Sequence, residues 1–190
     1  MNKGLEKFND LVEAFEMLPT IGKKSALRLA YHIVIENTFT GMKLAHSIET
    51  AIRDIKKCTK CHSISENEIC EICLDDDREN NSLCIVQSAK DIFVLEESKQ
   101  YHGKYFVMES LEVDAMEALQ DLVAYRDIKN VLFAITPSLA NDAFILYIED
   151  KLAGRGIEFT KIAQGVPTGV SLENVDILSL SKAIHGQTKI

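Results

Sequence analysis

The chain has 190 residues, of which 46% are hydrophobic and 26% are charged, and its formal net charge is −8. This composition excludes a disordered chain, and no apolar stretch approaches the roughly 20 residues that span a bilayer. The N-terminus, MNKGLEKFND, lacks the apolar run of a signal peptide, so we expect a cytoplasmic protein. In such a reducing compartment, a close cluster among the five cysteines favours a metal site over a disulfide framework.

Charge is distributed unevenly along the chain. Residues 1–60 contain ten Lys or Arg and seven Asp or Glu, whereas residues 61–190 contain eleven and twenty-two. The N-terminal third could therefore meet a polyanion that the remainder would repel. A simple difference between surface faces would also produce this imbalance, so the charge count alone does not decide between the two explanations.

Helical periodicity begins near the N-terminus and is interrupted by Pro19 and Gly22. A first helix precedes this break, with an apolar stripe of Leu5, Phe8, Leu11, Val12, Phe15 and Leu18. A second helix runs from about 23 to 35, and its predicted core stripe is Ala26, Leu29, Ala30, Ile33 and Val34. A third helix follows, with the inward residues Leu44, Ala45, Ile48, Ala51, Ile52 and Ile55.

The break between the first two helices, LPTIGKKSALR, is typical of a helix-hairpin-helix. The hairpin amides and the N-terminus of the second helix would form a positive pocket that suits a phosphate. Lys23 and Lys24 add charge there, and Arg28 and His32 follow Lys24 at intervals of four residues on one face. Such an arrangement binds the DNA backbone and does not read base sequence. The alternative is a helical corner whose polar stripe is simply solvated.

Four of the cysteines form two CxxC pairs separated by eight residues: Cys58, Cys61, Cys70 and Cys73. Zn²⁺ favours four tetrahedral ligands, and four thiolates leave no open coordination position. The spacing therefore predicts about one structural zinc ion per chain, in preference to a redox site or a disulfide. His62 follows a ligand and is expected to be exposed, whereas Cys84 lies in an apolar strand and is expected to be a buried small hydrophobe.

After an acidic linker, LDDDRENN, short apolar runs rich in β-branched residues alternate with helical patterns. The runs are LCIVQ, YFVM, VLFAI and IEFTKI, and helices are expected at 89–97, 113–125 and 139–152. Strands that alternate with helices predict a mostly parallel sheet covered on both faces. A turn-rich tail follows, with a short amphipathic helix at about 176–185 that we expect to dock on this domain or on another subunit.

Several motifs occur in one order: FEMLPTIGKKSALRLAYH, the four-cysteine knuckle, LCIVQSAKDIFVLEES and GKYFVM. Over most of its length the chain resembles the RecR recombination-mediator family, and its tail GVPTG…LENVD is similar to that family's Walker B-like segment. The resemblance implies an α+β multi-domain fold: a helix-hairpin-helix domain, a four-cysteine zinc finger, a Toprim α/β domain, and a C-terminal Walker B-like segment with a helix. The corresponding boundaries are 1–55, 56–76, 77–163 and 164–190.

The resemblance also implies a mediator of recombinational DNA repair and not an enzyme. Such a mediator forms a homo-oligomer, a dimer or a tetrameric ring, that binds single-stranded and double-stranded DNA without sequence preference. RecO-type and RecF-type partners work with it to place RecA recombinase on gapped or single-stranded DNA, at the nucleoid. Lys24 and Arg28 match basic positions of the family's hairpin motif, and Lys23 is an additional lysine.

This chain departs from the family pattern in the hairpin and in one loop. Thr20 stands where the hairpin usually has its first glycine. A β-branched residue is poorly suited to positive φ, which weakens the argument for a close amide cradle more than the argument from the lysines. In addition, ESLEVD replaces a longer loop after the second Toprim strand, where relatives carry partner contacts.

The Toprim carboxylates are also incomplete. Toprim enzymes hold Mg²⁺ with a glutamate after the first strand and an Asp-x-Asp pair after a later strand. This chain has Gln87 at the first position and Ala140 at the second, which leaves Asp142 as the only carboxylate there. A metal-dependent phosphoryl-transfer enzyme of the Toprim type is therefore the disfavoured alternative, and a structural zinc protein without DNA contact is a third. Asp91, Glu96 and Asp142 are candidate partner-binding acids, although Asp91 and Glu96 also fit an ordinary helix surface.

Overall fold

The computed structural model describes residues 4–163, 165–166 and 168–186, apart from the side chain of Leu178. The chain forms two compact units, Met1–Ile55 and Lys56–Ile190. Within the described ranges, no helix has the length and apolarity needed to cross a membrane. Gln164 and Pro167 of the predicted Walker B-like segment lie outside the described residues. The boundaries at 76/77 and 163/164 both fall inside the second unit and stay predictions.

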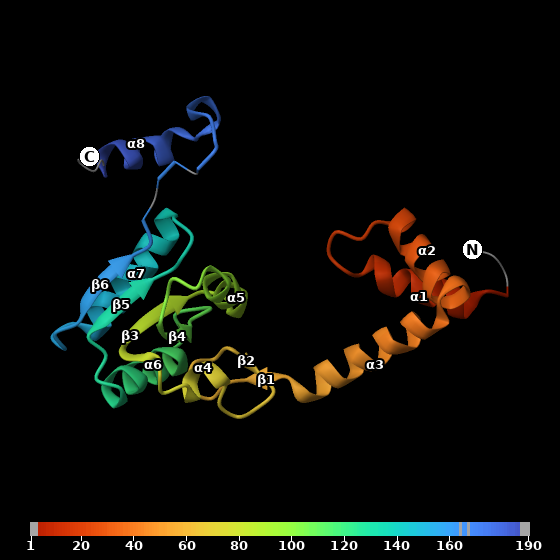
Figure 1. Ribbon diagram of the computed structural model, residues 1–190, viewed down its shortest axis with the longest axis horizontal. Coiled ribbons are helices and arrows are strands. Elements are labelled where there is room, and N and C mark those ends of the chain that lie inside the picture. Colours follow the sequence, from red (N-terminus) through yellow and green to blue (C-terminus); the bar gives the residue numbers. More distant parts are fainter. Residues whose placement is uncertain (1–3, 164, 167, 187–190) are drawn as a thin grey trace. The chain divides into compact units, whose positions relative to one another are not determined.

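The first unit consists of helices joined by short turns (Figure 1). Its elements are α1 (Glu6–Glu16), α2 (Lys23–Tyr31), the π-helix η1 (His32–Glu36) and α3 (Thr38–Asp54). The break predicted from Pro19 lies between α1 and α2, and Gly22 is the residue that precedes the first turn of α2. The three helices predicted in this part of the chain are therefore confirmed.

The second helix ends earlier than predicted, because its last turn widens into the π-helix. There the amide of Asn37 donates to the carbonyl oxygen of His32 at 2.7 Å, five residues back. The Asn37 side chain then caps α3 by accepting from the amide of Thr40 at 3.0 Å. Gly41 permits α3 to approach η1 closely, since a Cβ at this position would lie 2.8 Å from the carbonyl oxygen of Ile33. The wide turn thus sets the course of the chain into α3.

The core of the first unit is small. Val12, Ala26 and Ala30 are buried, with partly buried Phe8, Leu11, Phe15 and Ile21 around them. The predicted stripes of the first two helices are therefore wrong at their margins, since Leu5, Leu18, Leu29 and Val34 are exposed. The contacts between α1 and α2 bury mainly small side chains of α2, which leaves its larger apolar residues at the surface.

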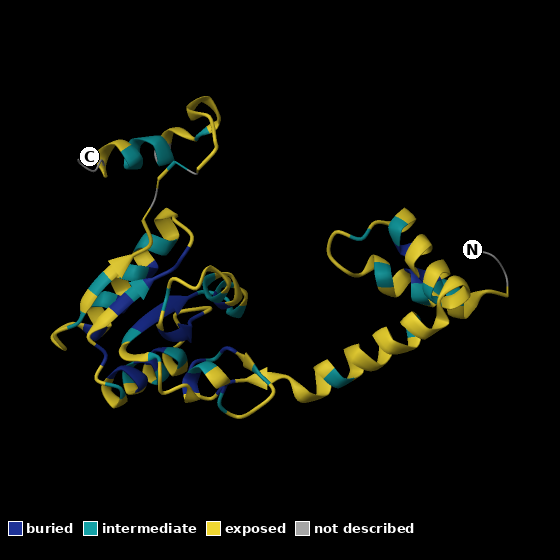
Figure 2. Ribbon diagram, in the orientation of Figure 1, coloured by how far each residue is buried: buried dark blue, intermediate teal, exposed yellow. Residues whose placement is uncertain are grey.

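The third helix departs furthest from its prediction. None of its residues is buried, and Figure 2 shows it as exposed along almost all of its length. Ile52 is 78% exposed, and Leu44, Ile48 and Ile55 are also exposed, so their predicted inward orientation is wrong. Helical periodicity identifies an apolar stripe correctly but does not reveal whether the same chain supplies a surface to cover it.

The second unit begins with the four-cysteine segment. Two short antiparallel strands, β1 (Lys56–Lys57) and β2 (Ile64–Ser65), flank the first CxxC pair, and α4 (Glu71–Leu74) carries Cys73. The remaining strands form one sheet: β3 (Glu79–Val86), β4 (Gly103–Val107), β5 (Asn130–Phe133) and β6 (Glu158–Lys161). The connecting helices are α5 (Ala89–Ser98), α6 (Val113–Tyr125) and α7 (Leu139–Leu152).

The four-stranded sheet is parallel throughout, in the order β4-β3-β5-β6 (Figure 1). This arrangement confirms the predicted parallel sheet and is consistent with a Toprim-like α/β domain. Strand β3 begins at Glu79, inside the stretch that was predicted to be linker, because Glu79 pairs with Gly103 of β4 before a register shift. The acidic linker is therefore shorter than expected.

The sheet is covered on both faces, as predicted. Successive residues of a strand point to opposite faces. Leu83 and Ile85 join a buried cluster with residues of α6 and α7, whereas Cys84 and Val86 join a second cluster with Ile92 of α5. The prediction for Cys84 as a buried hydrophobe is confirmed, and burial raises the pKa of its thiol to about 12.

The tail contains a 3₁₀ turn (Leu172–Asn174) and α8 (Ile177–His185). The predicted tail helix is confirmed, one residue shorter at its start, because Asp176 caps it by accepting from the amide of Ser179 at 2.9 Å. Ile177 and Ile184 of α8 are exposed. The docking of this helix stays a prediction.

Candidate metal centre and nucleic-acid interface

The two CxxC pairs converge on one point. The sulfur atoms of Cys58, Cys61, Cys70 and Cys73 all lie within 4.8 Å of one another, and all four residues are buried. Zinc–sulfur bonds of about 2.3 Å in a tetrahedron place sulfurs about 3.8 Å apart, so these four sulfurs can hold one Zn²⁺ with little movement. Four soft ligands with no open position suit a structural ion.

Backbone hydrogen bonds shape each turn of the cluster. The amide of His62 donates to the carbonyl oxygen of Cys58 at 3.0 Å, and His62 itself adopts a left-handed conformation with a φ of 60°. The amide of Cys70 donates to the sulfur of Cys58 at 3.3 Å, which joins the two pairs. Amide donors of this kind stabilise thiolates and therefore favour the metal-bound form.

The sulfurs are too close for all four to be thiolates without a cation among them. Cys61 and Cys70 have their sulfurs 3.5 Å apart, and the hydrogen bond between them lowers the pKa of Cys70 and raises the pKa of Cys61. A Zn²⁺ ion supplies the positive charge that allows all four sulfurs to be thiolates, and the thiol protons are released to solvent.

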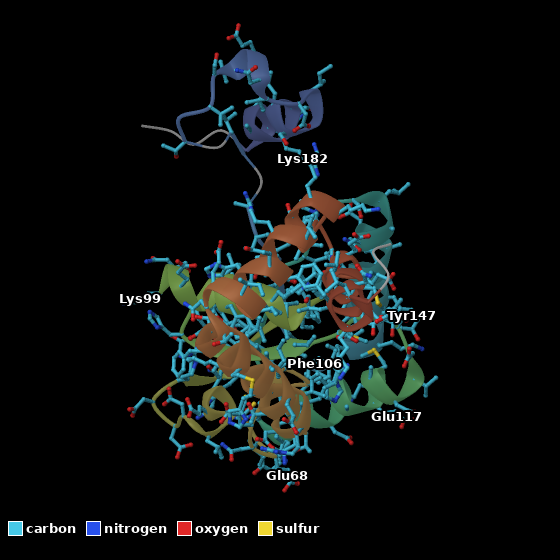
Figure 3. All side chains as sticks on the ribbon, turned by 90° about the vertical axis from the view of Figure 1, so that its right-hand side faces the viewer. Glu68, Lys99, Phe106, Glu117, Tyr147 and Lys182 are labelled. Atoms are coloured by element: carbon cyan, nitrogen blue, oxygen red, sulfur yellow. The ribbon has the colours of Figure 1, made fainter. Side chains whose placement is uncertain are left out.

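The prediction that His62 is exposed is wrong. Its ring centroid lies 4.8 Å from that of Phe106, the fully buried residue of β4 that is labelled in Figure 3, and His62 is half-buried. Burial is the largest cause that lowers the pKa of its imidazole. The left-handed turn directs this ring onto the sheet, and sequence spacing alone does not reveal that direction.

Two cations reach the metal segment from the sheet domain, and sequence analysis did not identify either. Lys104 of β4 donates to the main-chain oxygens of Ile72 and Asp75, and Arg126 donates to that of Cys73 at 3.0 Å. Burial lowers the pKa of Lys104. The one available signal was a lysine within the otherwise apolar run GKYFV.

The predicted DNA-contact residues lie on α2 in the first unit. Lys23, Lys24 and Arg28 are all exposed. Among the described residues, no carboxylate lies within 4.0 Å of their charged nitrogens. No side chain caps the N-terminus of α2, so its first amides remain available as donors beside Lys23 and Lys24. The face is therefore a positive surface without internal neutralisation.

The hairpin before α2 adopts the conformation that its usual glycine would favour. Thr20 has a φ of 68°, in the left-handed region that β-branched residues adopt only at a cost in free energy. The turn is closed by the amide of Ile21, which donates to the carbonyl oxygen of Leu18 at 3.3 Å. The hairpin geometry is therefore kept despite the substitution, and Thr20 carries strain there.

Just beyond α2, at the first residue of η1, the same stripe ends in a contact between His32 and Glu36. His32 follows Arg28 by one turn, and its Nδ1 lies 2.6 Å from a carboxylate oxygen of Glu36. Glu36 thus orients the imidazole at the end of the stripe. Lys24 and Arg28 are the two positions on this face that keep an unpaired positive charge.

The carboxyl edge of the sheet contains hydrogen-bonded amides where Toprim enzymes have carboxylates. The Gln87 side chain donates to that of Asn141 at 2.9 Å, and Asn141 donates to the carbonyl oxygen of Thr136 at 2.7 Å. Asp142 points instead to Lys161, whose ammonium lies 3.4 Å from the Asp142 carboxylate. Lys161 and Asn141 were not anticipated from the sequence, and both reduce the capacity of this edge to hold a divalent cation.

Asp91 and Glu96 each interact within the chain. Asp91 accepts from the amide of Ser88 in a capping box at the start of α5. Glu96 accepts from both terminal nitrogens of Arg78, at 2.6 and 2.9 Å, and from the hydroxyl of Tyr105. The Arg78 hydrogen bonds are the largest cause that lowers the pKa of Glu96. Partner binding by these acids stays a prediction, and their internal roles are structural.

Comparison with known proteins places these features in one family. A family model described as RecR, helix-hairpin-helix matches residues 8–52, and a second, for the four-cysteine zinc finger domain of RecR, matches residues 55–75. The chain is 56% identical over 190 residues to the recombination protein RecR of Campylobacter jejuni strain RM1221, with both chains fully covered. It is 54% identical to the protein of that name from a Nitratiruptor species, again over both full lengths. With the Helicobacter pylori protein the identity is 46% over 185 residues, covering 97% of this chain and 96% of the relative.

Proposed function

The chain belongs to the RecR family of recombination proteins, and we propose that it acts as a mediator of recombinational DNA repair. In this role it binds single-stranded and double-stranded DNA without sequence preference, as a ring-like homo-oligomer. With RecO-type and RecF-type partners it helps to load RecA recombinase onto gapped or single-stranded DNA. Its place of action is the nucleoid in the cytoplasm.

The observation that carries the DNA-binding proposal is the positive face of α2. Lys24 and Arg28 are one helical turn apart, exposed and unpaired among the described residues, in a chain whose net charge is −8. Lys23 and the uncapped amides of α2 add further donors. Phosphate contacts from lysine, arginine and helix N-termini fix a protein on DNA but carry no base information. Binding without sequence preference follows from that chemistry.

The apolar stripe of α3 supports the proposal of a homo-oligomer. Leu44, Ile48 and Ile52 follow one another at intervals of four residues on one face, and they are 40%, 50% and 78% exposed. A stripe of large apolar side chains along an exposed helix is typical of an interface between chains. In an oligomer, each copy contributes its own Lys24 and Arg28, so several weak phosphate contacts act together. The oligomer thereby compensates for a strained hairpin that holds a single phosphate weakly.

A non-enzymatic role fits the carboxyl edge of the sheet. Gln87 and Ala140 supply no charge, and the remaining carboxylate of Asp142 faces the ammonium of Lys161. A hard divalent cation requires several anionic oxygen ligands. The Toprim-type phosphoryl-transfer activity therefore lacks the carboxylates on which it depends, and we propose that this edge serves binding.

The acidic second unit is the proposed surface for protein partners. Residues 61–190 carry twenty-two acidic and eleven basic side chains, which repels DNA and favours basic protein surfaces. Asp142 and Asp91 are candidate contacts on the carboxyl side of the sheet. Because Glu96 holds Arg78 inside the fold, we expect its substitution to act first on stability and only through stability on partner binding.

DNA-binding measurements over a range of salt concentrations test the central proposal. We expect Lys24→Glu with Arg28→Glu to abolish binding to a mixed-sequence oligonucleotide, and each lost contact to reduce the log–log salt slope by roughly 0.7 to 0.9. The matched control is Lys7→Glu with Lys43→Glu, which makes the same change in net charge at exposed lysines of α1 and α3. The control should retain most of the affinity.

Zinc content and oligomer mass are measured in the same samples. Exposed charge substitutions alter stability by only about 0.5 kcal/mol, so both should be unchanged. Equal loss of affinity in the control and in the α2 variant would show that net charge matters and that the α2 stripe does not. Loss of binding together with dissociation of the oligomer would show that Lys24 and Arg28 serve the subunit contact first.

A further inference from the structure

Lys104 is a buried charged side chain on an edge strand of the sheet, next to the metal segment. It lies on the buried strand β4 and is only 1% exposed. Its ammonium donates to the main-chain oxygen of Ile72 at 2.9 Å and to that of Asp75. No carboxylate oxygen of the described chain lies within 4.0 Å of this nitrogen. A buried ammonium that has only carbonyl partners within hydrogen-bond distance costs free energy, and negative charge in its surroundings offsets that cost.

Arg126 approaches the same segment from the end of α6. One terminal nitrogen donates to the main-chain oxygen of Cys73 at 3.0 Å, and the other donates to the side-chain oxygen of Asn80 at 2.7 Å. Like Lys104, Arg126 has no carboxylate within ion-pair distance among the described residues. Two fixed cations thus hold the carbonyl oxygens of residues 72, 73 and 75, on either side of a zinc ligand.

The dipole of α4 does not account for this pair of cations. The helix has four residues, Glu71–Leu74, and so short a helix has only a small macrodipole. The loaded metal centre is a much larger charge. Four thiolates around one Zn²⁺ leave about two negative charges in excess. Cys58 and Cys61 are buried, at 0% and 1% exposure, so water screens this charge poorly.

We propose that Lys104 and Arg126 are the counter-charges of the zinc centre and determine how tightly the four cysteines hold the ion. The two cations are fixed on main-chain oxygens of residues 72, 73 and 75, beside a zinc ligand. They offset the negative charge that four thiolates and one Zn²⁺ leave in excess, and they therefore favour the zinc-loaded centre. Because Lys104 lies on β4 and Arg126 directly follows α6, the same contacts tie the metal centre to the sheet domain. The proposal is independent of DNA binding.

Competition for zinc with a chromophoric chelator, on the full chain, tests this inference. We expect Lys104→Met to weaken zinc binding about tenfold, at the lower end of the effect of residues that support metal ligands. Lys104→Arg keeps the charge and should retain most of the affinity. Lys57→Met is the matched control: Lys57 precedes Cys58 in sequence, but its side chain is exposed and pairs with Glu109 at 3.1 Å. The control should bind zinc as tightly as the parent chain.

A second variant decides the question if Lys104→Met does not fold. Arg126 is only partly buried, so Arg126→Gln should fold and should also bind zinc several-fold more weakly. Zinc affinity equal to that of the parent, in Arg126→Gln or in folded Lys104→Met, would overturn the proposal. An equal loss in Lys104→Met and Lys104→Arg would also overturn it, because packing and not charge would then be responsible.

Cobalt substitution separates charge from structure. In the Co²⁺-loaded protein, removal of a nearby cation raises the energy of the sulfur electrons. The sulfur-to-cobalt charge-transfer absorption should therefore move to longer wavelength in Lys104→Met and in Arg126→Gln, and remain in place in Lys57→Met. An absorption band at the same wavelength in all three variants would show that neither Lys104 nor Arg126 acts on the sulfurs electrostatically.

Discussion

The two units of the chain bury their apolar side chains to different extents. In the second unit, alternate residues of β3 enter two buried clusters on opposite faces of one sheet, and the metal cysteines form a third. In the first unit only Val12, Ala26 and Ala30 are buried among the described residues, and α3 buries nothing. The second unit therefore has a substantial buried core within one chain, whereas most of the apolar surface of the first unit stays exposed.

Removal of the metal should have the largest effect, and it should be confined to the second unit. Zinc binding by four cysteines supplies on the order of 10 kcal/mol of folding free energy. We therefore expect Cys61→Ser to lose zinc, unfold residues 56–76 and loosen β4, whose Val107 amide donates to the carbonyl oxygen of Cys61 at 2.8 Å. Hydrogen exchange resolved along the sequence measures this change.

The helices of residues 6–54 provide the internal control for that experiment. Because they belong to a separate compact unit, their protection from exchange should stay the same when zinc is lost. Full retention of zinc in Cys61→Ser would contradict the metal assignment. Equal loss of protection in both units would contradict the division of the chain into two independent parts.

Disruption of the α3 stripe should give the next largest effect, and it should be seen in oligomer mass. A buried charge at the centre of an interface costs about 2 kcal/mol or more, which corresponds to roughly 30-fold in a dissociation constant. We expect Ile52→Glu to dissociate the oligomer while the helices of each chain stay folded, because Ile52 is exposed in the single chain. Sedimentation velocity and circular dichroism together measure the two properties.

Lys43→Glu is the matched substitution on the same helix. Lys43 lies nine residues before Ile52 and therefore about half a turn away around the helix axis. This variant should keep the mass of the parent. An unchanged mass in Ile52→Glu would show that the stripe is not a subunit contact, and unfolding of the single chain would show that the stripe is covered within it.

Loss of the ion pair between Arg78 and Glu96 should reduce the stability of the second unit by a smaller amount. Arg78 lowers the pKa of Glu96 below its unfolded value, so the pair contributes stability above that unfolded pKa and loses it as pH falls through the folded pKa. We expect Glu96→Gln to reduce the free energy of unfolding by about 2 kcal/mol at neutral pH. The difference between variant and parent should shrink as the solution is made acidic.

Chemical denaturation at neutral and at acidic pH measures this dependence. Glu97→Gln is the control, because Glu97 neighbours Glu96 on α5 but is exposed. It should change stability by no more than about 0.5 kcal/mol. A difference for Glu96→Gln that stayed constant with pH would mean that packing, and not the ionised carboxylate, stabilises this part of the fold.

Relief of the hairpin strain should give the smallest effect. Thr20 has a φ of 68°, and glycine occupies that region without the steric cost of a Cβ. We expect Thr20→Gly to stabilise the first unit by about 1 kcal/mol, after the entropic cost of glycine is included. Thermal unfolding of the helices measures it. Ser25→Gly, inside α2, should have the opposite sign, and destabilisation by both substitutions would contradict the account of Thr20.

Patterns in the sequence predicted the helices, the strands and the metal ligands well, and they predicted the environment of individual side chains less well. The four cysteines were identified from spacing alone, because a metal imposes its own geometry on residues close in sequence. The parallel sheet followed from alternating strands and helices, since crossover connections leave few arrangements. Ile52 and His62 were misplaced because their environment depends on which surface faces them. Arg126 was missed because a hydrogen bond to a main-chain oxygen leaves no pattern in the sequence, and the one signal for Lys104 was its place within the apolar run GKYFV.

Native mass spectrometry with and without DNA tests the account most directly. If the exposed α3 stripe joins copies of the chain and their α2 faces together hold DNA, a defined oligomer forms in the absence of DNA. The same oligomer then carries one DNA molecule when DNA is added, and the DNA-bound species is absent for Lys24→Glu with Arg28→Glu. A monomer that bound DNA one chain at a time, with no oligomer at any concentration tested, would contradict this account.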